Sequence, residues 1–456
     1  METTRRTKQW LGIVALAGLL TACAATPQNP APPPGPAPGT PVPPTTGGET
    51  PVTPTPTPPT PGPMRFSPSG NAGMDAWRDD FATRAVASGR DPNVVFATLK
   101  DIRPLDLYLG DKTTVARTGV GDQAEFAKPI WDYVGTAVSE GRLTRGGARM
   151  TELSATFDAI EAKYGVDRAT LVAIWAMETN LGSYIGTFDA ANTLANMAVE
   201  GRRRSLGERE LLALMKLQEE GRVRRDQLVS GWAGAMGQTQ FMPSTFLAHA
   251  VDGDGDGRMD LWESEVDALA SAANYLAISG YQFGQPWGLE IIAPPGFDWS
   301  FADGQDRRMT TWKSLGLVPM TQAQFLVSDA SYAELWLPTG ATGPKYLLFK
   351  NFDVFKTYNR SDSYALSVGL LANGVEGQRG PVTPWPTQLG QLSRRDIMTL
   401  QSTLNRLGFP AGPIDGIAGR GTKGALRSFQ KANGITPADG YPTQQALGQV
   451  LAAASG

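Results

Sequence analysis

The chain has 456 residues, a length typical of two to four structural units. Hydrophobic residues make up 41% and charged residues 19%, which excludes wholesale disorder, and a formal net charge of −3 gives no indication of nucleic-acid binding. A single cysteine excludes an intramolecular disulfide, and a single histidine, His249, excludes a zinc site built on several Cys or His ligands. If the chain is an enzyme, carboxylates are therefore expected to transfer its protons, and we assign His249 no role.

Residues 1–22 have the features of a secretory signal. Arg5, Arg6 and Lys8 precede an apolar run that is too short to cross about 30 Å of hydrocarbon. The run ends in Leu-Thr-Ala-Cys, which resembles a bacterial lipobox with acylation at Cys23. This resemblance, with no aspartate directly after Cys23, implies a lipid anchor in the outer membrane of a Gram-negative bacterium, facing the periplasm. The alternatives are an ordinary signal peptide and an uncleaved anchor.

Residues 23–72 are expected to form a tether rather than a folded domain. Prolines occupy 17 of the positions in 27–63, where they alternate with Thr, Ala and Gly. Such a composition cannot form a core. An extended polyproline-type chain of this length reaches on the order of 100 Å, at about 3.1 Å per residue.

Residues 73–373 are predicted to form one large, mainly helical domain. Apolar residues recur with helical spacing over six segments, namely 76–88, 92–102, 126–140, 145–164, 167–180 and 209–218. Two later segments, 332–337 and 345–349, have the pattern of short strands. The prediction is a mainly α fold with a small β-containing insertion.

Within the 167–180 segment, Glu178 stands out as a candidate general acid. Asp167 is placed to cap the helix, and Leu171, Ile174 and Trp175 share one apolar face. Glu178 lies seven residues after Leu171 and four after Ile174, so it continues that face. Burial there would raise its pKa and keep it protonated, the state that an acid needs to protonate a glycosidic oxygen. The alternative is a solvated glutamate at the end of a helix.

A second candidate constellation is the segment 231–244. Small residues surround Gln238 and Gln240, which would let the backbone approach a ligand closely. The two amides can hydrogen-bond sugar hydroxyls or acetamides, and Trp232 offers a flat face to a sugar ring. A tight turn between helices would have a similar composition, so this alternative stays open.

Four motifs together resemble the membrane-bound lytic murein transglycosylase B family, which has a lysozyme-like fold. They occur in order, as METNLGS at 177–183, AGAMGQTQFMPS at 233–244, ANYL at 273–276 and YNRSDSYA at 358–365. The resemblance implies cleavage of the MurNAc–GlcNAc β-1,4 bond of peptidoglycan glycan strands, leaving 1,6-anhydromuramic ends. It gives Glu178 the role of acid and then base, with the C6 hydroxyl of the substrate as nucleophile.

The same resemblance implies substrate-binding roles at matching positions, namely Tyr133, Arg203, Arg204, Gln240, Tyr275, Asn359 and Tyr364. For the arginine pair, a solvated helix end remains an alternative. One departure is Gly231, where some family members carry serine; Ser230 is adjacent but is expected to point elsewhere. Two other functions stay open: a hydrolytic muramidase, which needs a second carboxylate, and a wall-anchoring lipoprotein without activity.

Residues 252–263 fit the twelve-residue EF-hand pattern for Ca²⁺. Aspartates stand at positions 1, 3 and 5 (Asp252, Asp254 and Asp256), a glycine at position 6, Arg258 at position 7 and Glu263 at position 12. Resemblance to the transglycosylase family favours Asp267 over Glu263 as the last ligand. A calcium ion here is expected to be structural, and no organic cofactor is expected. The alternative is an acidic turn capped by its own backbone.

A second linker, 374–392, is predicted before a small domain of three helices at 393–456. The pattern of the domain resembles a peptidoglycan-binding domain, with a core that contains Leu400, Leu404, Leu426 and Phe429. Its ligand groove is assigned to the loop with Asp415, Gly416 and Arg420. The implied partners of the whole chain are glycan strands and, through the lipid anchor, the outer membrane.

Overall fold

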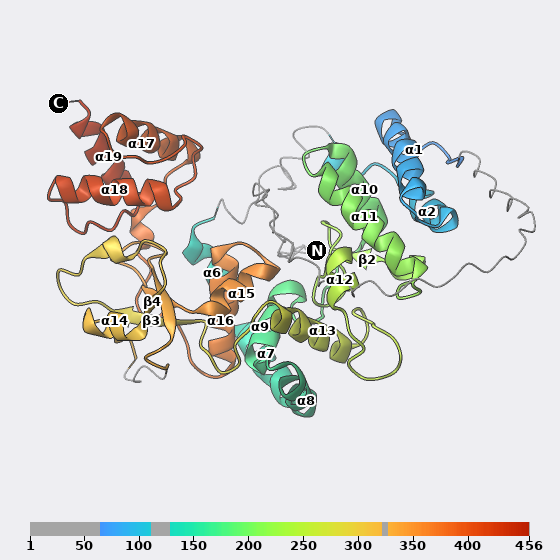
Figure 1. Cartoon of the computed structure of the whole chain (residues 1–456), viewed down its shortest axis with the longest axis horizontal. Helices are drawn as coiled ribbons and strands as arrows, with labels where there is room; N and C mark the ends of the chain where they lie inside the picture. Colours follow the sequence, from blue (N-terminus) through green and yellow to red (C-terminus); the bar gives the residue numbers. More distant parts are fainter. Residues whose placement is uncertain (1–63, 111–127, 322–326, 456) are drawn as a thin grey trace, which may run out of the picture.

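The computed structural model describes residues 64–110, 128–321 and 327–455. The predicted signal, Cys23 and most of the proline-rich tether lie outside these residues. The described chain is mainly helical, with one small sheet, and this confirms the predicted fold class (Figure 1). Among the described residues, no helix is both long and apolar enough to cross a membrane.

One group of helices, blue and green in Figure 1, forms the amino-terminal side of the large domain. It consists of α1 (Ala72–Ala87), α2 (Pro92–Leu99), α3 (Asp106–Leu109), α10 (Ala190–Glu200) and α11 (Arg204–Glu219). Helix α10 packs along α11 and also contacts α1, α2 and α3. Side-chain caps start the first two helices, because Asn71 accepts from the N–H of Met74 and Asp91 from that of Asn93.

The middle of the molecule surrounds one central helix, α9 (Arg168–Thr179), in which every residue from Ala169 onward is buried. Its neighbours are α6 (Ile130–Ala137), α7 (Glu140–Glu152), α8 (Ser154–Tyr164), α12 (Pro243–His249), α13 (Glu265–Ile278), α15 (Lys350–Tyr358) and α16 (Asp362–Val375). Helices α16, α7, α13 and α8 contact α9 directly. Because neighbouring helices pack around α9, its carboxyl-terminal end, where Glu178 lies, has a fixed position.

Two of the predicted helices differ from the structure. The single helix expected over 145–164 is wrong, because α7 ends and α8 begins at Leu153. No glycine or proline marks this break, and the apolar pattern continues through Leu153, so the spacing alone indicates one helix. The helix expected over 126–140 is shorter, since α6 begins directly after Pro129.

Residues 288–349, which we call the insert, contain an antiparallel sheet with strand order β4-β6-β7-β3-β5. Its elements are β3 (Gly288–Ile292), β4 (Arg307–Arg308), α14 (Met309–Ser314), β5 (Val318–Pro319), β6 (Tyr332–Trp336) and β7 (Tyr346–Leu348). The sheet covers its own core around Trp312, whose indole N–H donates to the carbonyl of Ala333. A separate pair, β1 (Phe188–Asp189) and β2 (Val229–Ser230), lies in the large domain.

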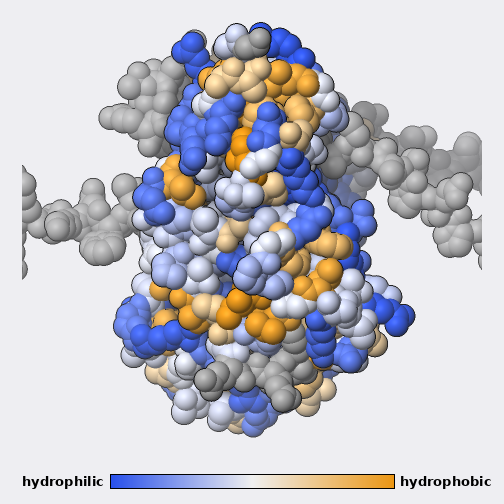
Figure 2. Space-filling model, turned by 90° about the vertical axis from the view of Figure 1, so that its left-hand side faces the viewer, coloured by the Kyte–Doolittle hydropathy of each residue, from blue (hydrophilic) through white to orange (hydrophobic). Residues whose placement is uncertain are grey.

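The C-terminal domain packs three helices, α17 (Arg394–Arg406), α18 (Arg420–Ala432) and α19 (Gln444–Ala453), on a core of its own. The four predicted core residues are buried there. Ser393 and Asp396 form a capping box that starts α17. Figure 2 views the molecule from the side of this domain and the insert, and hydrophobic side chains gather in its upper and lower parts.

The segment 374–392 was predicted as a linker, and the structure binds it to the insert. The N–H groups of Val382 and Thr383 donate to the two carboxylate oxygens of Glu290, at 2.7 and 2.8 Å. The side chain of Trp385 packs against the large hydrophobic core. The segment is therefore a fixed connection, because the Glu290 carboxylate binds its backbone and the large core contacts Trp385.

Candidate active site

Glu178 lies in the last turn of α9, with only 6% of its surface exposed. The hydroxyl of Tyr364 donates to its Oε1 at 2.5 Å. Burial, and then the Glu178 charge, raise the pKa of Tyr364 well above its usual value, so this phenol remains the hydrogen-bond donor. The helical spacing thus correctly placed Glu178 on the buried face, and the solvated helix end is excluded.

Aromatic side chains line the surroundings of this carboxylate. Tyr358, Tyr275 and Phe241 form a cluster with ring centroids 5.2 to 5.9 Å apart, and Tyr133 is buried on α6. Burial, and then Glu178, raise the pKa of Tyr358 far above normal. Its hydroxyl is buried and makes no hydrogen bond to any described residue. Sequence reasoning missed Tyr358, although it opens the fourth motif.

The backbone directly after Glu178 adopts an unusual turn. Asn180 and Leu181 have φ values of 54° and 64°, and Gln240 has 50°; these are the positive-φ residues other than glycine in the described chain. Such conformations are costly for residues with a Cβ and persist where surrounding contacts fix them. Here the Thr179 hydroxyl donates to the Gln238 carbonyl at 2.6 Å and accepts from the Gly182 N–H at 3.0 Å. The first two motifs are thereby bonded to each other.

The two glutamines of the second motif have different surroundings. Gln238 accepts from the Trp175 indole at 3.0 Å and donates to the Trp262 carbonyl at 3.1 Å, so both ends of its amide bind protein groups. Gln240 donates to the Gly237 carbonyl at 2.9 Å, while its buried Oε1 has no partner among the described residues. Gln240 therefore keeps an acceptor for a ligand, and a sugar contact by Gln238 has no support from this arrangement.

Two further predicted residues, Asn359 and Tyr275, hold the chain around Glu178 in place; we call these surroundings the pocket of Glu178. Asn359 is buried at the end of α15, where its Oδ1 accepts from the N–H of Ser361 at 3.0 Å. Ser361 in turn caps α16 by accepting from the N–H of Tyr364. The hydroxyl of Tyr275 donates to the Thr357 carbonyl at 2.9 Å. These bonds hold the fourth motif in place, and with it Tyr364, which touches Glu178.

The remaining candidates lie away from Glu178 or point elsewhere. Arg203 and Arg204 stand at the start of α11, where Arg204 is exposed and pairs with Glu208 at 3.0 Å. Ser230 is fully buried and donates to the carbonyl of Gly231 at 3.0 Å, so it does point elsewhere. His249, to which we assign no role, packs against Tyr275 with ring centroids 4.7 Å apart and the rings tilted by 39°.

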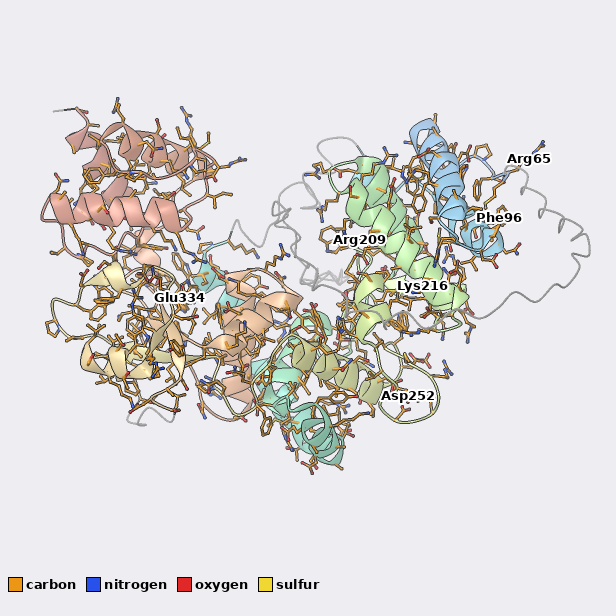
Figure 3. The ribbon with its side chains drawn as sticks, in the orientation of Figure 1. Arg65, Phe96, Arg209, Lys216, Asp252 and Glu334 are labelled. Carbon is orange, nitrogen blue, oxygen red and sulfur yellow. The ribbon has the colours of Figure 1, made fainter. Side chains whose placement is uncertain are left out.

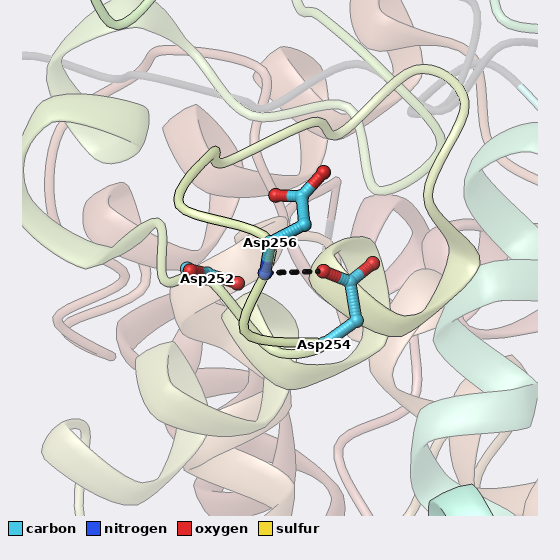
Figure 4. Close-up of side chains that lie close together, drawn as sticks. All are labelled: Asp252, Asp254 and Asp256. Atoms are coloured by element: carbon cyan, nitrogen blue, oxygen red, sulfur yellow. Dashed lines mark hydrogen bonds between the residues drawn. The ribbon is translucent and has the colours of Figure 1, made fainter.

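The predicted calcium loop brings three carboxylates together (Figure 4). Oxygen atoms of Asp252, Asp254 and Asp256 lie within 4.8 Å of one another. Asp252 also accepts from the N–H groups of Gly255 and Gly257, and the φ of Gly257 is 88°, as the tight turn at position 6 requires. A set of carboxylate oxygens at this spacing suits a hard cation such as Ca²⁺.

The two candidates for the last ligand have different positions. Asp267 is buried, and its Oδ1 and Oδ2 accept at 2.7 Å from the N–H groups of Gly253 and Asp260. Burial raises the pKa of Asp267. Glu263 is exposed, and neither residue belongs to the acidic group of Asp252. Asp267 therefore connects the two sides of the loop through hydrogen bonds to Gly253 and Asp260. A direct bond from Asp267 or Glu263 to a metal stays a prediction.

In the C-terminal domain, the predicted groove residues shape their own loop. Gln401 donates to Asp415 at 2.9 Å and accepts from the Gly416 N–H at 3.0 Å. A Cβ on Gly416 would lie 2.4 Å from the side chain of Arg394, so only glycine fits there. Arg420 reaches over to Gly304 of the insert. A ligand contact by these three residues stays a prediction.

A helical domain that buries one carboxylate at the end of its central helix, beside tyrosines and glutamines, belongs to the lysozyme-like class. Residues 73–373 match the family model described as the transglycosylase SLT domain, and residues 393–449 match that of a peptidoglycan binding domain. The chain therefore belongs to the transglycosylase SLT domain family, whose members cleave peptidoglycan.

Three relatives place the chain more closely. It is 33% identical over 223 residues to membrane-bound lytic murein transglycosylase B of Escherichia coli K12, and the match covers 46% of this chain and 58% of that protein. SltB3 of Pseudomonas aeruginosa, solved with NAG-anhNAM-pentapeptide, matches with a TM-score of 0.76 and 36% identity over 84% of this chain and all of that one. Escherichia coli Slt35 in complex with calcium matches with a TM-score of 0.54 and 25% identity, covering 68% and 94% of the two chains.

Proposed function

We propose that the chain is a lytic murein transglycosylase that cleaves the MurNAc–GlcNAc β-1,4 bond and leaves 1,6-anhydromuramic ends. The observation that carries the proposal is the buried Glu178 at the end of α9, held by the hydroxyl of Tyr364. The family of the chain, and the anhydro-muropeptide bound in the SltB3 structure, support the choice of reaction.

In the proposed reaction, Glu178 transfers protons in both directions. Its carboxyl protonates the glycosidic oxygen as the bond from C1 to that oxygen breaks. The resulting carboxylate then takes the proton of the C6 hydroxyl as the bond from O6 to C1 forms. No water enters, so the muramic end is one water lighter than a hydrolysis product. The Tyr364 hydroxyl holds one carboxyl oxygen in place and stabilises the charged form of the acid.

The surroundings of Tyr364 and Tyr358 favour a mechanism with a single carboxylate. Among the described residues, the charges that raise the pKa of these two phenols come from Glu178 and from other tyrosines, Tyr133 and Tyr275. A hydrolytic muramidase would need a second carboxylate as nucleophile or to activate water. None acts on these two tyrosines in the described part of the chain.

Digestion of purified peptidoglycan by the mature protein tests this reaction, with mass spectrometry of the new muramic ends. Anhydro ends are expected, and they should disappear with Glu178→Gln. Reducing ends would identify a hydrolase instead. No cleavage by the wild-type protein, together with retained binding to the wall, would favour the anchoring function.

We also propose that the acidic loop holds a structural Ca²⁺ through Asp252, Asp254 and Asp256, with the backbone carbonyl of Arg258 as a further oxygen. The support is the spacing of the carboxylates and the hydrogen bonds between the loop and Gln238 of the second motif. The carbonyls of Leu261 and Trp262, near the end of the loop, accept from the backbone and side chain of Gln238. Ordering of the loop would thus support the second motif. A rise in melting temperature with added Ca²⁺, absent in Asp254→Asn, is the expected result.

Anchoring at Cys23 completes the proposal. Acylation of this residue would place the enzyme at the outer membrane, and the C-terminal domain would bind the wall. The support is the lipobox pattern and the membrane-bound relative. Labelling of growing cells with a radioactive fatty acid should mark the wild-type protein and leave Cys23→Ser unmarked. Equal labelling of both would disprove the anchor at this position.

A further inference from the structure

A cavity of about 770 Å³ lies between the C-terminal domain and the large domain. Helix α18 forms one wall, and strand β6 of the insert and helix α15 form the others. Glu334 of β6 is labelled in Figure 3, where it lies at the junction of the insert with the C-terminal domain. The cavity lies within the range of 300–1,000 Å³ that is typical of small-molecule sites, and Glu178 is not among its lining residues.

Bonds between the two domains fix the walls of this cavity. Arg427 of α18 donates to the Ala302 carbonyl of the insert at 3.0 Å, and Asp439 accepts from the N–H of Ala341 at 2.7 Å. Lys431 and Asp298 form an ion pair across the same junction, at 2.6 Å. The cavity is therefore a preformed feature of the docked domains.

Two charged side chains of opposite sign line the cavity without partners. Glu334 on β6 and Lys423 on α18 are both half-buried. Within the described residues, neither side chain makes a hydrogen bond or an ion pair, whereas nearby Lys356 pairs with Asp362 at 2.7 Å. Burial raises the pKa of Glu334 and lowers that of Lys423, which is the effect of removing an unpaired charge from water.

Unpaired, half-buried charges are unfavourable unless something supplies their counter-charges. The described protein supplies opposite charges only at a distance, from Arg420 and Lys356 for Glu334. Asp362 and Asp439 do the same for Lys423. Neither group is bonded directly, so a ligand that bonds to both would gain binding energy. It must carry both a carboxylate, for Lys423, and an ammonium group, for Glu334. A bare glycan strand carries neither at this density, while a short peptide with free carboxyl and amino groups carries both.

The position of the cavity relates it to the pocket of Glu178. Lys356 lies in the last turn of α15, three residues before Asn359, and Asp362 is the first residue of α16, two before Tyr364. The cavity thus opens beside the elements that hold the catalytic carboxylate. Helices α15 and α16 therefore border both the cavity and the surroundings of Glu178.

We propose that this interdomain cavity binds the stem peptide of the glycan strand, with Lys423 pairing with a peptide carboxylate and Glu334 with a peptide ammonium group. This inference rests on the proposed function, because it takes the substrate to be peptidoglycan. It makes Lys423 and Glu334 specificity residues for peptide-bearing strands, and the C-terminal domain a part of the substrate site.

The test compares two ligands in the full-length mature protein. Glu178→Gln serves as the background, so that no ligand is consumed. Isothermal titration calorimetry measures its affinity for glycan oligomers with intact stem peptides and for the same oligomers stripped of peptides by an amidase. Lys423→Met and Glu334→Gln are each expected to weaken binding of the peptide-bearing oligomers about tenfold, the order of one lost charge-assisted bond. Binding of the stripped oligomers should not change.

Matched variants separate this effect from a loss of folding. Lys163→Met removes an exposed lysine of α8 outside the cavity and should change neither affinity. Lys423→Arg keeps the charge and should restore most of the peptide preference. Equal losses for both ligands, or no loss for either, would overturn the inference.

The outcome is independent of the reaction type. If the wild-type protein gives reducing ends while the peptide preference depends on Lys423, the proposed transglycosylation fails and the cavity proposal stands. Anhydro ends together with no peptide preference would support the proposed transglycosylation and contradict the cavity proposal.

Discussion

The pocket of Glu178 and the interdomain cavity place a buried glutamate in opposite situations. In the pocket, the Tyr364 hydroxyl binds the carboxylate directly, and Ser361 and Asn359 of the fourth motif hold that tyrosine in place. In the cavity, which Lys423 and other charged residues also line, Glu334 receives no bond from the described protein. A carboxylate that performs chemistry is positioned by its own protein, while one that recognises a ligand is left for the ligand to satisfy.

The largest expected effect comes from removing the catalytic carboxylate. Glu178→Gln keeps the size of the side chain and its contact with Tyr364, but it cannot donate and recover a proton. Release of muropeptides from the wall should fall by about a thousandfold. Sedimentation with insoluble wall should remain at the wild-type level. A variant that still digests the wall would show that another residue is the acid.

Next in size is the loss of the tyrosine that holds this carboxylate. Tyr364→Phe removes one charge-assisted hydrogen bond, so kcat should fall about ten- to a hundredfold while KM changes little. The alkaline limb of the pH profile should also move to higher pH, because Tyr364 favours the charged form of Glu178 and the acid must be protonated to act. Tyr164→Phe, which removes a hydroxyl of α8 that bonds to no described residue and lies outside the cavity, provides the matched control. An unchanged pH profile would argue against this role.

A smaller effect is expected from the turn that bonds the first two motifs. Thr179→Val replaces the hydroxyl that binds the Gln238 carbonyl and the Gly182 N–H, leaving two groups unsatisfied. Unfolding should become easier by about 1–3 kcal/mol, measured by urea denaturation. Thr179→Ser keeps the hydroxyl and should recover most of this stability. Equal losses in both variants would assign the effect to packing of the methyl group.

The smallest effect concerns the junction of the domains. The Lys431 ammonium, together with the Ser300 N–H, lowers the pKa of Asp298 from 3.8 to about 2. Because the folded-state pKa is lowered, the ion pair stabilises the fold above pH 4, and this contribution is lost as the pH falls through about 2. Asp298→Asn should therefore lower the free energy of unfolding at pH 6, by less than about 1 kcal/mol, and by much less at pH 2. A difference that persists at pH 2 would exclude this pair as its cause.

Much of the fold and part of the pocket could be predicted from the sequence. Spacing along one helix placed Glu178 on a buried face, and the pattern of the C-terminal domain placed Leu400 and Leu404 in its core. These are short-range effects, in which each residue acts on neighbours within one or two turns.

Features that depend on distant contacts could not be predicted. The break at Leu153 has no breaker residue, and the proline-rich segment after 373 is fixed by Glu290, far earlier in the chain. Glu334 and Lys423 each have an ordinary local pattern, and they face the same cavity only because the two domains dock. Likewise, the hydrogen bond from the Trp175 indole to the Gln238 amide could not be predicted, because it depends on the three-dimensional arrangement.

The fixed connection between the insert and the C-terminal domain affects how the chain would bind a polymer. A domain on a loose linker increases the local concentration of any site within its reach, and its contribution falls off smoothly with linker length. The bonds of Glu290 to the backbone of Val382 and Thr383, together with the bonds between domains, remove this freedom. The distance between the wall-binding surface and Glu178 is then a constant of the molecule. Under the proposed function, a strand bound by the C-terminal domain would meet Glu178 at a fixed separation from its bound point.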